Sequence, residues 1–295
     1  MKVIIPMSGF GKRFLDAHYE RPKPLIRVDG KPIIEHVISM FPSGQDFIFV
    51  CAKEHLNATD MESVLKRVAP SSKIISIPQH SYGPVFTVKH IFGDISDDED
   101  LLITYCDYYM EWDFEDMIKK VKEGNFAGAV PSYTGFHPHL LRRELYGGVL
   151  VEDGVMKDYM EKHSFTYNPE ESHHSVGAYY FSNGKLFKKY VEELYNSNIR
   201  HDGEAYVSMI YYLYLRDGHK IYVPEAKKFM QWGTPTDLEE YESWSRHIHK
   251  ELGREKGKTD IPEEREKYVK IPYDENSEEF KKCYTYWKNY FLNTK

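Results

Sequence analysis

Apolar residues in the first hundred positions form two kinds of pattern that follow each other along the chain. Short continuous apolar runs are typical of buried strands, whereas apolar positions that recur every three or four residues are typical of amphipathic helices. Strands that alternate with helices indicate a parallel sheet with crossover helices, and such sheets bind ligands at the carboxyl ends of their strands. The expected strands are 3–5, 46–51, 73–77 and 101–105, and the expected helices are 33–41, 60–69 and 85–92.

From about residue 126 the pattern changes, because strand-like segments follow one another with few helices between them. We therefore predict an α/β, Rossmann-like three-layer fold with a mainly parallel central sheet and a mixed second half. The expected strands of this half are 127–130, 148–151 and 175–181, and the expected helices are 185–195, 204–216 and 235–252.

The end of the chain has a different composition. Residues 253–279 are highly charged and poor in core residues, which predicts a linker or a loosely packed arm. Residues 280–292 carry aromatic side chains near helical spacing, so we expect a helix that docks on the body or on a partner subunit, which leaves a homo-oligomer open. The predicted organisation is one domain over 1–245 and a charged linker with a C-terminal helical extension over 246–295.

Composition and charge narrow the function. The 295-residue chain has a formal net charge of −7, which gives no general attraction to nucleic acid. Any anionic ligand must be bound by a local concentration of positive charge. Three cysteines lie far apart without metal-ligand spacing, and the first apolar run is far too short for a signal peptide or membrane span. We expect a cytoplasmic protein with no membrane partner, and we interpret His173 and His174 as loop residues rather than metal ligands.

The turn after the first strand concentrates positive charge. It reads S-G-F-G-K-R-F from Ser8, and R-P-K-P-L follows from Arg21. Two glycines allow backbone amides to approach a phosphate closely, and three cations add the charge that a triphosphate requires. The turn is not a Walker A motif, which needs G-x-x-x-x-G-K-[ST], and it is not the dinucleotide fingerprint, because the third glycine of G-x-G-x-x-G is absent. The cations are Lys12, Arg13 and Lys23.

This order of glycines, basic residues and proline-lysine resembles the sugar-phosphate nucleotidyltransferase family, whose usual signature is G-x-G-[TS]-R-[LMF] followed by P-K. Residues 29–32, DGKP, also match, and the resemblance extends from residue 1 to about 245. It implies an Mg²⁺-dependent enzyme that condenses a nucleoside triphosphate with a sugar 1-phosphate to give an NDP-sugar and pyrophosphate. Many relatives serve surface polysaccharide synthesis.

The resemblance also implies roles for individual residues. Arg13 and Lys12 would hold the leaving phosphates, Lys23 would act at the α-phosphate, and Asp107, directly after the strand 101–105, would bind Mg²⁺. Lys162 would anchor the substrate phosphate. The implied catalytic residues are Arg13, Lys23 and Asp107; the nucleotide-binding residues are Met7, Ser8, Gly9, Gly11, Lys12, Arg13, Gln79 and Gly83; and the substrate-binding residues are Tyr146, Gly147, Glu161, Lys162, Gly177 and Glu204.

Some positions leave alternatives open. Gln79 also fits an ordinary polar turn, and Glu204 also fits a charge at a helix start. Gln231 stands where many relatives carry a second magnesium-binding aspartate, and a neutral amide is a poorer Mg²⁺ ligand than a carboxylate. We interpret Asp237 as a first-turn helix charge.

Two other functions fit the same motifs. One is a CTP-dependent transferase that acts on a non-sugar phosphate, such as a phosphorylated alcohol or amine. The other is a nucleotide-binding regulatory protein without turnover. The sequence identifies neither the base nor the acceptor.

Overall fold

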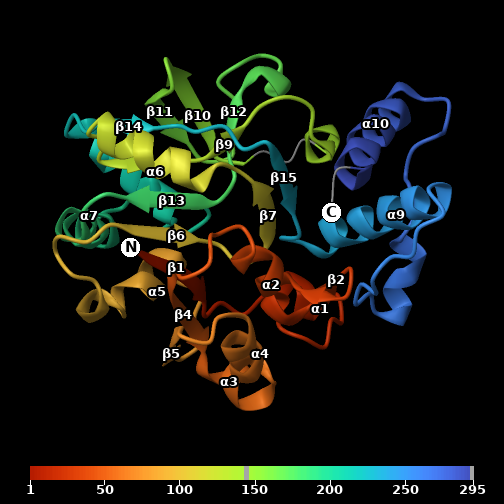
Figure 1. Cartoon of the computed structure of the whole chain (residues 1–295), viewed down its shortest axis with the longest axis horizontal. Helices are drawn as coiled ribbons and strands as arrows, with labels where there is room; N and C mark the ends of the chain where they lie inside the picture. Colours follow the sequence, from red (N-terminus) through yellow and green to blue (C-terminus); the bar gives the residue numbers. More distant parts are fainter. Residues whose placement is uncertain (143–145, 293–295) are drawn as a thin grey trace.

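The computed structural model describes residues 1–142 and 146–292 (Figure 1). The N-terminal half forms four parallel strands in the order β5-β4-β1-β6, as the sequence predicts. Both faces of β1 are buried, which explains its continuous apolar run. These strands are β1 (Lys2–Met7), β4 (Asp46–Ala52), β5 (Lys73–Ile77) and β6 (Leu101–Thr104).

The second half continues the same sheet with mixed strand directions. β13 lies antiparallel to β6, and in the described residues the sheet reaches eleven strands, continuing as β13-β8-β14-β11-β10-β12-β9. A separate two-stranded sheet joins β7 (Tyr108–Glu111) to β15 (Lys228–Gln231). The added strands are β8 (Gly128–Ala129), β9 (Ser132–Tyr133), β10 (Gly148–Glu152), β11 (Val155–Met160), β12 (His173–Ser175), β13 (Ala178–Phe181) and β14 (Ile221–Tyr222).

Helices cover both faces of the sheet, so the predicted three-layer α/β class is confirmed. One core contains Val3 and Ile5 of β1 together with side chains of α2 (Ile33–Ile38), α4 (Met61–Val68), α6 (Phe114–Glu123), α9 (Pro235–Glu251) and α10 (Glu278–Leu292). The other contains Ile4 and side chains of α5 (Pro84–Lys89), α7 (Gly184–Asn196) and α8 (Ile210–Arg216). Alternating side chains of one strand thus enter opposite cores. Of the helices that the structure describes, none is long and apolar enough to cross a membrane.

Some local features differ from the sequence prediction. His173 and His174, interpreted as loop residues, begin the strand β12, and His174 is buried. The expected strand 175–181 is broken at Gly177, whose φ of +100° lies outside the extended region, so β12 ends before it and β13 begins after it. The expected helix from 204 begins only at the 3-10 turn Val207–Met209, which leads into α8. A short helix, α1 (Lys12–Asp16), follows the glycine turn and was not predicted.

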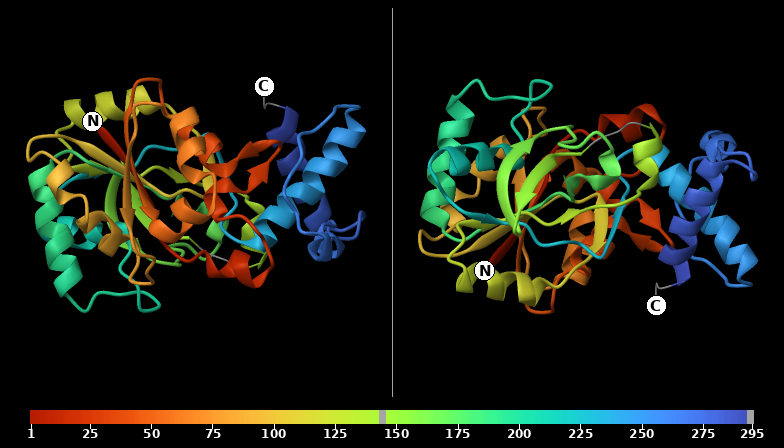
Figure 2. Two further views of the ribbon diagram at one scale, coloured as in Figure 1. Left: turned by 90° about the horizontal axis from the view of Figure 1, so that it is seen from below. Right: turned by 90° about the horizontal axis from the view of Figure 1, so that it is seen from above.

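The C-terminal extension lies at one end of the molecule, beside the hairpin of β2 (Arg27–Val28) and β3 (Lys31–Pro32) (Figures 1 and 2). α10 packs on α9, with the rings of Trp287 and Phe291 within 6 Å of Tyr241. The charged stretch between the two helices contains the 3-10 turn Glu263–Tyr268. α9 includes residues 245 and 246, so the predicted boundary between the domain and its C-terminal extension falls within one helix. The division of the chain into these two parts stays a prediction.

Candidate active site

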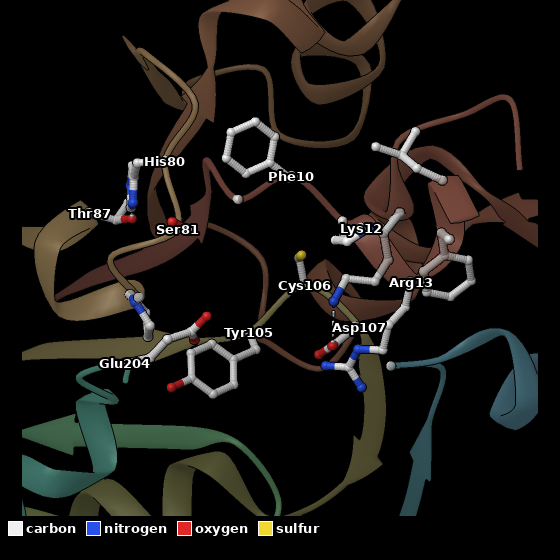
Figure 3. A pocket seen from close by; sticks show the side chains of 18 of the residues that line it. Phe10, Lys12, Arg13, His80, Ser81, Thr87, Tyr105, Cys106, Asp107 and Glu204 are labelled. Carbon is white, nitrogen blue, oxygen red and sulfur yellow. Dashed lines mark hydrogen bonds and ion pairs between the residues drawn. The ribbon is translucent and has the colours of Figure 1, made fainter. Parts of the chain in front are cut away.

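The site forms where two neighbouring parallel strands end. β1 leads into the glycine turn, and β6 leads through Tyr105 and Cys106 to Asp107. Because β1 and β6 are adjacent and parallel, the turn and Asp107 meet at the same edge of the sheet. Figure 3 shows the Arg13 guanidinium directed toward the Asp107 carboxylate across this edge.

Two cavities open at this edge. The first, which we call the loop cavity, has a volume of about 620 Å³ and lies between the glycine turn and the start of α5. The second, the tyrosine cavity, has a volume of about 550 Å³ and lies between the residues just before β10, those just after β11, the 175–179 segment and β15. Five residues line both cavities, so ligands bound in the two cavities would meet there. The shared residues are Arg13, Tyr105, Asp107, Tyr206 and Gly233.

The glycine turn has the backbone geometry that an anion-binding turn requires. Gly11 has φ +63° and precedes α1, and its carbonyl accepts hydrogen bonds from the amides of Phe14 and Leu15. Both Gly9 and Gly11 line the loop cavity, and among the described residues no atom beyond those flanking each glycine lies within 4 Å of where its Cβ would be. The backbone at both positions is therefore accessible to a ligand.

Met7 and Ser8 lie behind the turn rather than in the cavity wall. Ser8 is buried, with its Oγ 2.9 Å from Nε2 of His80 and 2.7 Å from Oγ1 of Thr87. Burial lowers the pKa of His80, so the imidazole is neutral near neutral pH. This hydrogen-bonded cluster fixes the start of the turn against α5, so the structure gives Ser8 a positioning contact within the protein.

Lys23 and Asp107 form an ion pair at the loop cavity, which both residues line, and Asp107 also lines the tyrosine cavity. Lys23 Nζ lies 2.8 Å from Asp107 Oδ2, and about three-quarters of each side chain is buried. Burial lowers the pKa of Lys23, but the Asp107 carboxylate more than offsets it, so the pKa is raised above its ordinary value. Lys23 is therefore a permanent cation at the site.

The other two cations of the motif differ in their surroundings. Lys12 is largely exposed and pairs with Asp16 one helical turn later, at 2.8 Å. Arg13 lines both cavities. The structure thus places Arg13 and Lys23 at the centre of the site and Lys12 at the rim of the loop cavity.

The predicted base-reading segment is only partly brought to the loop cavity. Gln79 points to the helix α3 (Lys53–Ala58), with Nε2 2.8 Å from His55 Nε2 and its backbone amide 3.1 Å from Glu54 Oε2. Gly83 lines the cavity, has φ +83°, and would place a Cβ 2.8 Å from the carbonyl oxygen of Ala205. The close approach of the two backbones explains why glycine occupies position 83.

Five predicted substrate residues line the tyrosine cavity. Glu161 accepts hydrogen bonds from Tyr159, at 2.9 Å, and from Ser208. Lys162 pairs with Asp202 at 2.5 Å, and both side chains are more than half exposed. The five are Tyr146, Gly147, Glu161, Lys162 and Gly177. The sixth, Glu204, lines the loop cavity instead.

Gln231 and Asp237 lie together at the edge of the tyrosine cavity. Gln231 is 7% exposed, and among the described residues its Oε1 has no hydrogen-bond partner. Asp237 accepts hydrogen bonds from the backbone amide and hydroxyl of Thr234, in a capping box, and from Arg142 at 2.6 Å. A carboxylate oxygen of Asp237 and one of Asp107 both lie within 4 Å of the point where Gly233 would carry a Cβ.

The sequence prediction missed Gly233 and two aromatic residues that line both cavities. Tyr105 comes two positions before Asp107, and Tyr206 lies in the segment that contains Glu204. Both residues lie close in sequence to predicted site residues, and this proximity was the one feature of the sequence that could have identified them. Their residue type could not, because tyrosine is common throughout this chain. Within the described parts of the chain, no cluster of three or more His, Cys, Asp or Glu residues could hold a metal ion.

The fold is shared with several solved nucleotidyltransferases. The structure aligns with a nucleoside-diphosphate-sugar pyrophosphorylase from Vibrio cholerae RC9 (TM-score 0.65, 17% identity, 80% of this chain and 97% of that chain). It also aligns with an inositol-1-phosphate CTP transferase from T. maritima (TM-score 0.59, 16% identity, 80% of this chain and 90% of that chain). These likenesses show that the chain has the nucleotidyltransferase fold.

The sequence comparison then gives the family. The sequence model of the MobA-like NTP transferase domain matches residues 3–161, more than half of the chain, and the chain belongs to that family. Glucose-1-phosphate cytidylyltransferase of Salmonella typhi is 28% identical over 184 residues, which are 55% of this chain and 69% of that protein. The resemblance to sugar-phosphate nucleotidyltransferases is confirmed.

Proposed function

We propose that this protein transfers a nucleotidyl group from a nucleoside triphosphate to a sugar 1-phosphate and releases pyrophosphate. The observation that carries the proposal is the pair of cavities that share Arg13 and Asp107, in a chain of this family. A triphosphate in the loop cavity and a phosphate in the tyrosine cavity would meet at these residues.

The proposed reaction requires charge neutralisation and positioning more than proton transfer. An oxygen of the sugar phosphate attacks the α-phosphorus, and the bond from that phosphorus to the bridging oxygen of the β-phosphate breaks, so pyrophosphate leaves with its electron pair. The nucleophile is already anionic, so no strong general base is needed. Lys23 and Arg13 are the cations in place to stabilise the charge that develops there.

The pairing of Lys23 with Asp107 supports this role. Before the substrate binds, Asp107 neutralises Lys23 in a largely buried place, at 2.8 Å. An arriving α-phosphate offers Lys23 another anion and releases Asp107 for a cation. The ion pair therefore keeps both groups in position before the ligands arrive.

The same residues fit a magnesium ion. Asp107 would hold it, and the buried, unpartnered Oε1 of Gln231 is an oxygen donor at the edge of the same cavity. The Asp237 carboxylate is engaged by its capping box and by Arg142. Mg²⁺ often binds through one or two carboxylates with water and substrate phosphates. When bound, it would supply positive charge that polarises the phosphate oxygens.

A phosphorylated amine is the second candidate acceptor. The tyrosine cavity combines the Glu161 carboxylate with six aromatic side chains, and aromatic rings with a carboxylate also suit a cationic amine. The nucleotide-binding residues would be the same for both acceptors. The aromatic residues are Tyr105, Tyr108, Tyr146, Tyr179, Tyr206 and Phe229.

We further propose that the reaction takes place in the cytoplasm and supplies activated sugar for polysaccharide synthesis. The three cysteines are free and buried, which agrees with a reducing compartment.

The test is pyrophosphate release from each of CTP, UTP, dTTP, GTP and ATP with Mg²⁺. Each triphosphate is combined with a panel of sugar 1-phosphates and phosphorylated alcohols and amines, and the Asp107→Asn variant is the matched control. Release with a sugar 1-phosphate, lost in the variant, supports the proposal. Release only with an amine supports the second candidate. A protein that binds a triphosphate in a thermal-shift assay but releases no pyrophosphate with any acceptor would overturn both, in favour of a regulatory protein.

A further inference from the structure

A short segment of the C-terminal extension is hydrogen-bonded to the hairpin β2–β3. We call residues 256–260 the arm. Asp260 donates its amide to the carbonyl of Arg27 at 3.0 Å, and its carboxylate accepts the amide of Arg27 at 3.0 Å. The carbonyl of Lys258 accepts the amide of Gly30 at 2.7 Å. The arm therefore pairs with backbone groups at the start of β2 and in the turn between β2 and β3.

Gly257 and Lys256 also hold the arm close to the hairpin and to α9. A Cβ at Gly257 would lie 2.1 Å from the carbonyl carbon and oxygen of Asp29, a contact that only a shift of the backbone would relieve. Lys256 Nζ lies 2.8 Å from Glu242 of α9 and 3.5 Å from Asp29. Asp29 also accepts a hydrogen bond from Tyr241 of α9 at 2.6 Å. The arm, α9 and the hairpin thus form one connected unit.

The hairpin in turn fixes the segment that carries Lys23. Ile26 donates its amide to the carbonyl of Lys23 at 3.2 Å and accepts the amide of Ile33 at 2.9 Å. Leu25 and Ile26 are fully buried. Arg27, whose amide and carbonyl both bond to Asp260, follows Ile26 directly. A displacement of Arg27 would therefore reach the backbone of Lys23 through a buried, hydrogen-bonded segment with little freedom to absorb it.

We propose that the arm positions Lys23 for the transfer step, with Thr259 and Asp260 as positioning residues; this rests on the proposed function. Thr259 contributes through its Oγ1, 3.3 Å from the amide of Asp29. Lys23 must place its ammonium at the reacting phosphate, and a misplacement of about 1 Å can cost about 10²-fold in rate. The C-terminal extension thereby contributes to catalysis without contact to substrate.

The experiment is a double-mutant cycle in the whole chain. Thr259→Ala with Asp260→Ala removes the two side-chain hydrogen bonds to the hairpin, and Lys23→Ala removes the group that they position. The matched control is Glu266→Gln, which weakens an ion pair of the same extension with Arg246 (2.8 Å) and leaves the hairpin bonds intact. Steady-state kcat and the KM for the triphosphate are measured for each variant, with thermal unfolding to show that it is folded.

We expect the double variant to lower kcat about ten-fold with KM changed less than about two-fold. In the Lys23→Ala background the same double change should lower kcat less than about two-fold, because the residue that it positions is absent. The control should keep wild-type kcat. Equal reductions of kcat in both backgrounds would overturn the proposal, because a merely structural effect does not depend on Lys23.

A measurement that needs no turnover separates this proposal from the proposed function. Amide hydrogen exchange of residues 22–33 should become faster in the double variant, and also in Gly257→Ala, than in the wild type and the Glu266→Gln control. Unchanged exchange in both variants overturns the positioning role, even if the enzyme is active. If the wild type has no transferase activity but exchange rises as expected, the proposed function fails while the structural coupling stands.

Discussion

Replacement of Lys23 by alanine tests the chemistry most directly. We expect kcat to fall by about 10²–10³-fold, which corresponds to about 2.7–4 kcal/mol of lost transition-state stabilisation. The affinity for the triphosphate should change far less, because the charge at position 23 acts mainly on the α-phosphate while the new bond forms. Pyrophosphate release under saturating triphosphate and acceptor gives kcat.

The stability effect of Lys23→Ala should be moderate. The variant leaves Asp107 without its cation at 2.8 Å, in a place where the two side chains are 23% and 24% exposed. Fully exposed ion pairs contribute about 0–1 kcal/mol, and removal of one partner of a fully buried pair costs about 3–5 kcal/mol. We therefore expect a loss of about 1–3 kcal/mol and a Tm lower by several degrees, so that the variant stays folded at assay temperature.

The pH dependence has a definite sign. The pKa of Lys23 is raised above its ordinary value of 10.5, so its contribution to stability is present below that value and is lost only as pH rises through the folded-state pKa. The difference in stability between wild type and Lys23→Ala should thus be constant from about pH 6 to about pH 9.

Lys12→Ala is the matched control on the same motif. Its ion pair with Asp16 is 79% and 59% exposed, so its loss should change stability by less than about 0.5 kcal/mol. We expect it to raise the KM for the triphosphate and to leave kcat nearly unchanged, since it would bind the leaving phosphates equally before and during the reaction. A folded Lys23→Ala enzyme with kcat within about ten-fold of wild type would refute the role assigned to Lys23.

Three further predictions concern the metal and the thiols. Asp107→Asn should abolish magnesium-dependent turnover while circular dichroism shows an intact fold; unchanged dependence on Mg²⁺ concentration would exclude the metal role. Calorimetric titration should detect only weak Mg²⁺ binding to the nucleotide-free enzyme and tighter binding to Gln231→Asp, because the change adds a carboxylate; tight binding to the wild type would mean that another carboxylate completes the site. Burial raises the pKa of the thiols of Cys51, Cys106 and Cys283 to about 12, so at about pH 8 only about one in 10⁴ is ionised. The folded protein should therefore react with a thiol reagent only slowly, and fast labelling of Cys106 without denaturant would contradict its burial.

The sequence by itself determined the N-terminal half of the fold and the position of the phosphate turn. Apolar runs predicted β1, β4, β5 and β6; in β1, β4 and β6 the run is nearly continuous because both faces of the strand are buried. Once a parallel sheet was predicted, Asp107 and the glycine turn had to lie at the same edge of it, at the carboxyl ends of their strands. The structure shows that these two strands are also neighbours. Those deductions depend only on local pattern and on a general property of parallel sheets.

Only the tertiary structure decided which side chains meet at the site. Tyr206 lines both cavities because the segment before α8 folds over Gly83, and Gln79 points away because His55 is its hydrogen-bond partner. The contact of Arg27 with Asp260 joins residues 233 positions apart. Periodicity reports which face of an element is buried, but it does not report which distant element covers that face. Contacts of this kind follow from packing, in which shape and hydrogen bonding across the whole chain select the partner.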